Sequence, residues 1–367
     1  SDDAIREAAQ VITKSQRPVI VAGGGVTSSR AQQEVVELAE MLNIPVATSL
    51  NAKGTITDDH RLSVGVVGSY SRWCANRVVA EADLVIYIGS HTGSQVTNEW
   101  KVPAQGTPVI QIDIEPAELG RSYPNEVSLQ GDAKATVQKL IESLEPTHDR
   151  TEWTSRAAEL VAQWREEVLP RATSNAVPII PERLCNELTQ ALPPDSILVA
   201  DTGHAGIWTG SMVDLNHTGQ DYIRCAGSLG WGLSGAIGVK CALPNRPVVS
   251  FSGDGGFMYH IAELETAVRY NIPVVSVVNN NHGLLQDKRG DDRAYQAVPG
   301  SQSSDLWEFN DVDMAKVAEA MGAFGIRVDQ PQDIQSAIEE ALASGRPAVV
   351  DVVTDPLDSE APIPWSP

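Results

Sequence analysis

Two groups of oxygen-bearing side chains in the C-terminal half of the sequence have the types and spacing of a cation site. The first is Gly253-Asp254-Gly255-Gly256 and the second is Asn279-Asn280-Asn281, with 24 residues between the second glycine and the second asparagine. Mg²⁺ prefers a carboxylate, neutral oxygens and phosphate oxygens in octahedral geometry. Asp254 supplies a carboxylate, Asn281 an amide oxygen and Gly283 a main-chain carbonyl. The pattern predicts a divalent cation that holds a diphosphate.

Glycines surround the predicted carboxylate ligand. Gly253, Gly255 and Gly256 carry no Cβ, so the backbone can approach a phosphate closely, and a helix that starts here turns its positive end toward it. The alternative is a tight Asp-Gly turn followed by an unrelated asparagine-rich loop. Either half alone favours that alternative, but the two together favour a functional site.

These groups follow two predicted strands, 248–251 and 274–278, which flank a predicted helix. The helix is indicated by apolar residues at three- and four-residue spacing: Ile261, Leu264, Ala267 and Val268. A right-handed crossover between parallel strands brings both strand ends to one edge of the sheet. Open α/β sheets bind their ligands at that edge.

Gly-Asp-Gly, a gap of this length and Asn-Asn together form the signature of thiamine-diphosphate enzymes. Over essentially its whole length the sequence resembles the superfamily of acetolactate synthase, benzoylformate decarboxylase and 2-hydroxyacyl-CoA lyase. The resemblance implies thiamine diphosphate and Mg²⁺ as cofactors. Members of the family have three α/β domains in order: a pyrimidine-binding domain, a central domain and a diphosphate-binding domain. This sequence resembles the second and third.

The expected architecture is therefore two doubly wound parallel-sheet α/β domains. We expect a central domain over 1–145, a linker with a charged amphipathic helix over 146–178, and a diphosphate-binding domain over 179–357. The remaining residues, 358–367, form a tail that either folds over the site as a lid or is a disordered end. The alternation of apolar strands with helices supports this fold class.

The first domain has one candidate nucleotide site. A buried strand over 19–22 runs into Gly23, Gly24 and Gly25 and then a helix, an order that suits a phosphate at a helix end; a tight turn explains it equally well. The resemblance implies FAD, ADP or a CoA nucleotide here. Asp113, at a strand end, either bonds a ribose hydroxyl or caps the next helix. Flavin-binding members carry an arginine where this sequence has Ser90-His91-Thr92, which argues against FAD.

Two glycine-rich turns in the second domain are further candidates for cofactor contacts. Gly203, His204 and Ala205 follow a strand, and the resemblance implies that they bind the diphosphate; the alternative for His204 is a helix cap or a core position. Around Gly227, Ser228 and Leu229 the resemblance implies a loop that bends thiamine, with Leu229 as an apolar wedge. The alternative is a glycine-lined groove for helix packing.

The resemblance implies that the polar stretch 282–293, which we expect to be a loop, lies over the cofactor. Leu284 is predicted to contact the cofactor, and His282, Leu285 and Gln286 to face the substrate. No catalytic residue is assigned in this sequence, because the family's catalytic glutamate belongs to the pyrimidine-binding domain and comes from the opposite subunit. We therefore expect a partner chain or a missing N-terminal domain, an oligomer (homo- or hetero-, dimer or tetramer), and an inactive isolated chain.

The predicted chemistry makes or cleaves C–C bonds next to a carbonyl, by decarboxylation or carboligation of 2-oxo acids, as in acetolactate synthase. A 2-hydroxyacyl-CoA lyase is an alternative, since Arg269-Tyr270-Asn271-Ile272-Pro273 and the triple asparagine resemble those enzymes. A non-catalytic nucleotide- or thiamine-binding regulatory protein is another.

Composition limits the remaining possibilities. The net charge of −21 argues against nucleic acid or an anionic membrane as partners. The four cysteines form no C-x-x-C pair, which is typical of a reducing compartment. No apolar run reaches the ~18 residues of a membrane span, and we expect a cytoplasmic protein.

Overall fold

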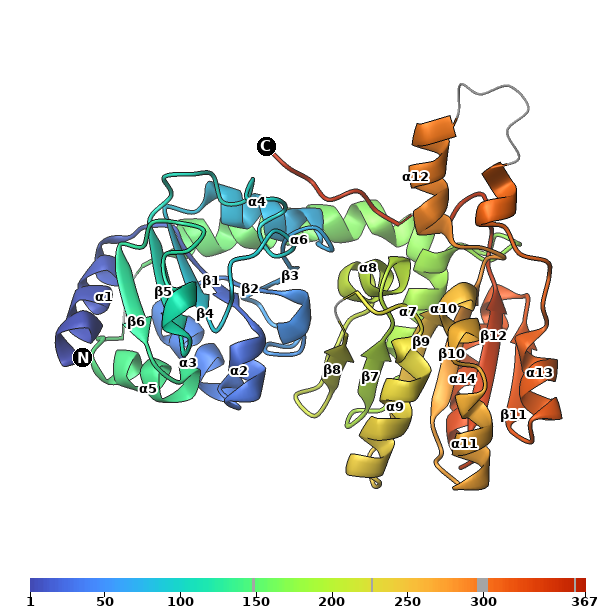
Figure 1. Ribbon diagram of the computed structural model, residues 1–367. Helices are drawn as coiled ribbons and strands as arrows, with labels where there is room; N and C mark the ends of the chain where they lie inside the picture. Colours follow the sequence, from blue (N-terminus) through green and yellow to red (C-terminus); the bar gives the residue numbers. More distant parts are fainter. Residues whose placement is uncertain (147–148, 226, 296–302, 360) are drawn as a thin grey trace. The chain divides into compact units, whose positions relative to one another are not determined.

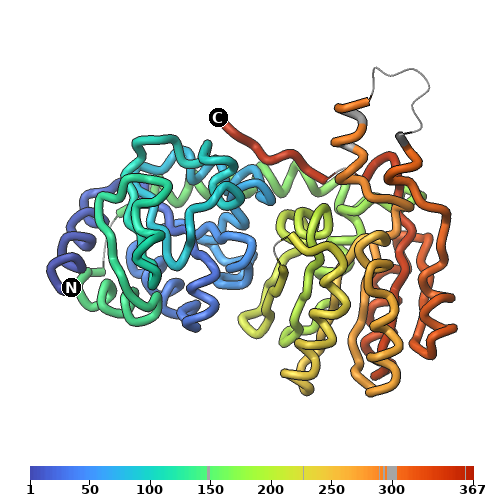
Figure 2. Tube along the Cα trace, viewed as in Figure 1, coloured from blue at the N-terminus to red at the C-terminus, as the bar shows by residue number. Residues whose placement is uncertain are grey.

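A computed structural model describes residues 1–146, 149–225, 227–295, 303–359 and 361–367. The chain folds into two compact units, which can be followed in Figures 1 and 2. Unit 1 comprises Ser1–Glu167, Asp214–Thr218 and Ile363–Pro367, and unit 2 comprises Val168–Val213 and Gly219–Pro362. Among the described helices, none is long and apolar enough to cross a membrane.

Unit 1 is built on a six-stranded parallel sheet of order β3-β2-β1-β4-β5-β6. Its strands are β1 (Pro18–Ala22), β2 (Val46–Thr48), β3 (Ser63–Val66), β4 (Leu84–Ile88), β5 (Val109–Asp113) and β6 (Val127–Gln130). Its helices are α1 (Asp2–Lys14), α2 (Gly24–Ser28), α3 (Gln32–Leu42), α4 (Trp73–Glu81), α5 (Ala133–Glu142) and most of α6 (Thr151–Ala172), with short 3₁₀ turns η1 (Leu50–Ala52) and η2 (Pro116–Glu118).

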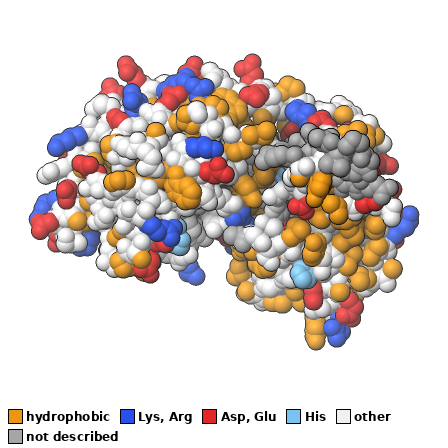
Figure 3. All heavy atoms as spheres, turned by 45° about the horizontal axis from the view of Figure 1, so that its top comes forward, with side chains coloured by type: hydrophobic (Ala, Val, Ile, Leu, Met, Phe, Trp, Pro, Cys, Tyr) orange, Lys and Arg blue, Asp and Glu red, His pale blue; other side chains and the backbone are white. Residues whose placement is uncertain are grey.

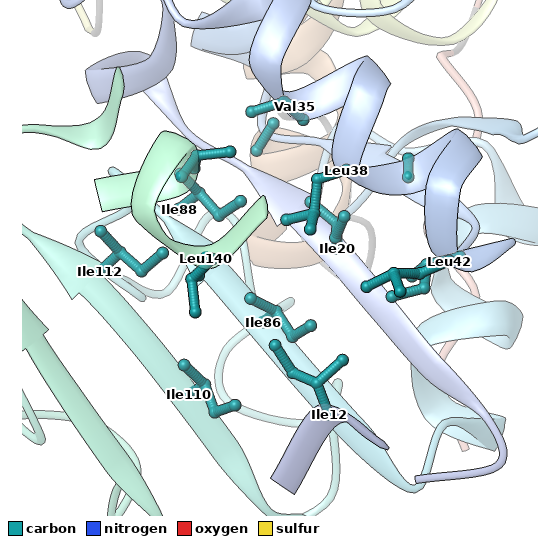
Figure 4. Packing of buried hydrophobic residues seen from close by; sticks show 14 of the residues in the cluster. Ile12, Ile20, Val35, Leu38, Leu42, Ile86, Ile88, Ile110, Ile112 and Leu140 are labelled. Carbon is teal, nitrogen blue, oxygen red and sulfur yellow. The ribbon is translucent and has the colours of Figure 1, made fainter. Parts of the chain in front are cut away.

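The strands of unit 1 are apolar because helices cover both faces of the sheet. Every residue of β1, β4 and β5 is buried, as expected for a parallel sheet with helices on both faces. On one face, isoleucines of these strands meet side chains of α1, α3 and α5, such as Ile12, Leu38 and Leu140 (Figure 4).

A segment that follows helix α8 (His204–Ser211) in the chain belongs to unit 1. Asp214 is paired with Arg72 and, at 3.0 Å, with Arg165. Asp58 accepts a hydrogen bond from the backbone N–H of Leu215 at 2.8 Å and pairs with Arg72 at 3.0 Å. Burial alone would raise the pKa of Asp214, but the two arginines lower it to about 2. Residues 214–218 are thus fastened to unit 1 by a buried ionic network.

The C-terminal segment and the predicted linker also bond to residues of unit 1. The backbone carbonyl of Trp365 accepts hydrogen bonds from the amides of Asn76 (2.8 Å) and Asn98 (3.3 Å), and Arg77 lies over the Trp365 ring. In the predicted linker, Trp153 donates to the carbonyl of Pro18 at 2.7 Å. Residues 147–148 of that linker and residue 360 of the tail lie outside the described residues.

Unit 2 contains a second six-stranded parallel sheet, of order β11-β12-β10-β9-β7-β8. Its strands are β7 (Ile197–Ala200), β8 (Asp221–Arg224), β9 (Val248–Gly253), β10 (Val275–Asn280), β11 (Phe324–Val328) and β12 (Ala348–Val353). Its helices are α7 (Pro181–Ala191), α8 (His204–Ser211), α9 (Trp231–Ala242), α10 (Asp254–Tyr259), α11 (Glu263–Arg269), α12 (Leu285–Tyr295), α13 (Met314–Ala320) and α14 (Ile334–Ala343), with η3 (Ser303–Leu306) and η4 (Pro331–Asp333).

The helices of unit 2 also cover both faces of its sheet (Figure 1). Leu233 of α9, Phe257 of α10 and Leu264 of α11 share one hydrophobic core with the strands. Helices α7 and α14 contact each other, and α14 packs on β12. The prediction of two doubly wound parallel-sheet domains is confirmed.

Candidate functional site

The two predicted ligand groups lie at one edge of the sheet of unit 2. Strands β9 and β10 are parallel neighbours, and their register pairs Gly253 with Asn279. Asp254 follows β9 directly and begins α10, while Asn281 follows β10 directly. Parallel pairing therefore puts the two strand tips side by side (Figure 1).

Asp254 is a buried carboxylate held by backbone donors. Its side chain is 2% exposed, and its two oxygens accept from the N–H groups of Gly255 (2.8 Å) and Gly283 (2.9 Å). Burial raises its pKa to about 7, against the opposing effect of these donors. A carboxylate in such a place gains most from a nearby cation. The bond from Gly283 also fixes the loop after β10 against Asp254.

The three asparagines after β10 differ in their contacts. Asn279 accepts from the Thr354 hydroxyl at 2.6 Å, and Asn280 donates to Asp351 at 2.8 Å. The side-chain oxygen of Asn281 is buried and has no hydrogen-bond partner in the part of the chain that the structure describes. An orphaned amide oxygen on one tip and a buried carboxylate on the next fit a hard cation such as Mg²⁺.

No group of three or more His, Cys, Asp or Glu side chains in the described ranges is arranged to hold a metal ion. A cation at the strand tips would therefore depend on one carboxylate, on neutral amide and carbonyl oxygens, and on oxygens from a bound ligand. That donor set suits Mg²⁺, which usually shares its coordination with phosphates.

The turn after β7 approaches the start of α12. Gly203 has a φ of 70°, a conformation that favours glycine, and an added Cβ would lie 2.8 Å from Oε1 of Gln286. His204 and Ala205 form the first turn of α8, the positively polarised end of that helix. The structure thus brings the predicted diphosphate turn beside one of the predicted substrate residues.

Two leucines cover the glycines that follow Asp254. An added Cβ on Gly255 would lie 2.5 Å from a methyl group of Leu284, and one on Gly256 would lie 3.2 Å from a methyl group of Leu229. The loop that carries Leu229 starts at Gly227, with a φ of 85°, and reaches α9 after Gly230. Four predicted cofactor residues are therefore in one neighbourhood.

The stretch after Asn281 differs from the expected loop. It forms α12 from Leu285 onward, and the N–H groups of Asp287 and Lys288 bond to the carbonyl of Leu284. The prediction of a polar loop over 282–293 was wrong for most of this range, because local charge said little about backbone hydrogen bonding. Leu285 is buried and Gln286 is exposed. His282 has a φ of 59°, and its backbone carbonyl accepts from the N–H of Phe309.

Two buried carboxylates of unit 2 received no role in the sequence analysis. Asp201 at the end of β7 and Asp351 within β12 are both fully buried, and burial raises the pKa of each. Asp351 accepts from Asn280, from the N–H of Met314 and from Arg327. Their signal in the sequence is an acidic residue at the end of, or inside, an apolar strand.

In unit 1 the glycines of the candidate nucleotide site have a packing cause. Added Cβ atoms on Gly23 and Gly25 would lie 2.2 and 2.7 Å from backbone atoms of Gly89, whereas Gly24 has ordinary space. Asp113 is buried, accepts from the N–H of Glu115 at 3.0 Å, and keeps a second oxygen without a hydrogen bond to any described residue.

Comparison with protein families gives two matches. Residues 5–140 match the central domain of thiamine pyrophosphate enzymes, and residues 201–352 match the C-terminal TPP binding domain of the same enzymes. These ranges fall on the two sheets described above.

Curated relatives give the same result. The chain is 31% and 32% identical to probable acetolactate synthase large subunits of Methanococcus aeolicus and Methanocaldococcus jannaschii, over 98% of its length and 62% and 61% of theirs. It is 34% identical to glyoxylate carboligase of Escherichia coli O157:H7, over 96% of this chain and 61% of that protein. The chain thus spans about three fifths of the length of these relatives. It belongs to the thiamine pyrophosphate enzyme family and carries the central and the C-terminal TPP-binding domains.

Proposed function

We propose that this chain binds Mg²⁺ and thiamine diphosphate at the edge of the unit 2 sheet. The ligands from the protein are the Asp254 carboxylate, the Asn281 side-chain oxygen and the Gly283 carbonyl. The observation that carries the proposal is the pairing of a buried carboxylate with an orphaned amide oxygen on adjacent parallel strand tips.

Other residues of the chain orient the cofactor in this proposal. The start of α8, with Gly203, His204 and Ala205, takes the diphosphate together with Gly255 and Gly256. Leu229 supports the thiamine rings, and the Gly227 carbonyl accepts a hydrogen bond from the 4′-amino group of the pyrimidine. When bound, thiamine diphosphate supplies a nucleophilic carbon and an electron sink for bonds next to a carbonyl.

The reaction we propose is decarboxylation and carboligation of 2-oxo acids. The relatives named above are synthases and a carboligase, which favours carbon–carbon bond formation over the lyase alternative. A nucleotide in unit 1 would bind the unbonded oxygen of Asp113. Gly23 and Gly25 are explained by their packing against Gly89, so they do not add evidence for a nucleotide site.

We propose that the catalytic glutamate comes from a pyrimidine-binding domain outside the matched three fifths of the relatives. Large hydrophobic side chains on unit 2, including Tyr259, Tyr270 and Leu306, are exposed, and hydrophobic atoms gather on its visible face (Figure 3). Such surfaces commonly mark contacts with a partner. We take 1–145 and 179–357 as the domain bounds, supported by family matches inside both ranges, with residues 214–218 as a segment of the second range that belongs to unit 1.

Calorimetric titration with Mg²⁺ and thiamine diphosphate tests the site. Asp254→Asn removes the anionic ligand and should abolish binding, and Asn281→Ala should weaken it about tenfold or more, the cost of one ligand. Asn279→Ala is the matched control, because the side-chain oxygen of Asn279 already accepts a hydrogen bond from Thr354. The affinity of this variant for the cofactor should stay within about threefold, well under 1 kcal/mol. Unchanged affinity in Asp254→Asn would remove the metal assignment.

A further inference from the structure

Asp201 lies where three glycine-containing segments of unit 2 meet. Its carboxylate is fully buried at the end of β7. Its Oδ1 accepts from the N–H of the next residue, Thr202, at 2.7 Å. An added Cβ on Gly256 would lie 2.9 Å from its Oδ2, so the turn after β9 packs directly on this side chain.

The same carboxylate binds the loop that leads into α9. The N–H of Gly230 donates to Oδ1 and Oδ2 at 3.0 and 3.2 Å, and the N–H of Gly232 donates to Oδ2 at 3.3 Å. Gly230 has a φ of 90° and precedes the first residue of α9. These N–H groups belong to the helix end that has no intrahelical acceptors and attracts anions.

A protein carboxylate therefore already occupies the anion-binding end of α9. That end is therefore closed to a diphosphate. A second bond joins the same segments, from the N–H of Gly227 to the Thr202 hydroxyl at 3.3 Å. The loop between Gly227 and Gly230 is thus fastened at both ends to the turn after β7, and Leu229 is held between them.

We propose that Asp201 is a positioning residue that sets the shape of the cofactor pocket. It holds the loop 227–230 so that Leu229 faces Gly256, and it joins this loop to the turn that carries Gly203. This inference rests on the proposed binding of thiamine diphosphate. Asp201 itself contacts neither the cofactor nor the cation in this proposal.

The test uses three variants of the full chain. Asp201→Asn keeps the size of the side chain but offers one uncharged oxygen. If that oxygen keeps the bond from Thr202, the NH₂ group faces the Gly232 N–H, so the bond from Gly232 is lost and Gly230 keeps one bond to a neutral acceptor. Thr202→Val removes only the hydroxyl that accepts from the N–H of Gly227. It tests the fastening of the same loop if Asp201→Asn folds poorly. Asp221→Asn is the control, because it breaks an ion pair with Arg246 elsewhere in unit 2.

Hydrogen exchange of backbone amides in the cofactor-free protein is the first measurement. In Asp201→Asn the Gly232 amide should exchange about tenfold faster or more, the effect of losing a bond to a charged group, and the Gly230 amide should also exchange faster because its acceptor is no longer charged. Thr202→Val should accelerate Gly227 alone, and Asp221→Asn should change none of the three. Unchanged exchange at Gly230 and Gly232 would overturn the role of Asp201.

Titration with Mg²⁺ and thiamine diphosphate is the second measurement. Asp201→Asn should bind about tenfold more weakly. At saturation its induced circular dichroism per bound cofactor should also be reduced, a change that a merely less stable protein would not show. Faster exchange with unchanged affinity and signal would overturn the positioning role. If the unaltered chain binds no cofactor, the proposed function fails, while the exchange result still decides how Asp201 holds the loop.

Discussion

At the scale of single residues, the site depends on which polar atoms are already bonded. Asn279 and Asn280 use their side chains to join β10 to Thr354 and Asp351, whereas the buried oxygen of Asn281 has no bond to a described residue. Asp254 has backbone donors but no paired side-chain cation among the described contacts. These two residues are therefore the ones whose energetics a bound cation would change most.

The pH dependence of stability follows from Asp254. Burial raises its pKa to about 7, well above the ordinary value of 3.8. A carboxyl group that holds its proton more tightly in the folded protein stabilises it fully below about pH 4, and this stabilisation is lost as the pH rises through about 7. We expect urea unfolding with a chelator present to show lower stability at pH 8 than at pH 5, with part of this slope absent in Asp254→Asn.

Excess Mg²⁺ and thiamine diphosphate should restore stability at pH 8, because a ligand that binds only the folded protein stabilises it. Asp221→Asn serves as the reference for losing a surface carboxylate. The interpretation of Asp254 would be contradicted by identical pH slopes in the unaltered protein and in Asp254→Asn.

At this scale the sequence predicted the candidate ligands but not their surroundings. The spacing of Gly-Asp-Gly and the asparagines singled out Asp254 and Asn281 without any coordinates. It could not show that Asn280 is bonded to Asp351, because 71 residues separate these two partners. Asp201 was passed over for the same reason, since its donors Gly230 and Gly232 come from a distant loop.

At the scale of helices and strands, Asp351 joins the elements beside the site. From β12 it accepts bonds from Asn280 of β10, from Arg327 of β11 and from the first residue of α13. Arg327 also pairs with Asp311 at the surface, at 2.6 Å. One arginine thus has a buried and an exposed acidic partner.

This pair gives a matched test of stability. Asp351 is 0% exposed and Asp311 66% exposed. Asp351→Asn should lower the free energy of unfolding by about 3 kcal/mol, because it leaves a partly buried arginine without its buried partner. Asp311→Asn should cost less than about 1 kcal/mol, as exposed ion pairs contribute little. Urea denaturation measures both, and equal losses would contradict a structural role for Asp351.

Strands were easier to predict than helices with many charges. The central strands β1, β4, β9, β10 and β12 are buried on both faces, so each is a run of apolar residues bounded by glycine, proline or a polar tip. Strand β6 alternates buried and exposed residues and gave no such run. Helix α12 was missed because its many charged residues are also typical of a loop.

At the scale of the whole molecule, the matched domains correspond to about three fifths of the length of the relatives. We expect the purified chain to show no turnover of pyruvate, because the proposed catalytic glutamate lies on another domain. Adding a pyrimidine-binding domain from a relative should produce turnover that depends on Mg²⁺ and thiamine diphosphate. The same domain with its glutamate replaced by glutamine is the control. Robust activity of the chain alone would contradict the division of the active site.

The segment Asp214–Thr218 has a consequence for how this protein can be divided. It follows α8 in the chain yet is bonded to Asp58, Arg72 and Arg165. Cutting the gene near residue 170 would separate Arg72 from Asp214 and leave a buried cation with one acidic partner fewer. Neither half would then be a complete folding unit. A fragment or chimaera that contains the N-terminal part must therefore also include residues 214–218.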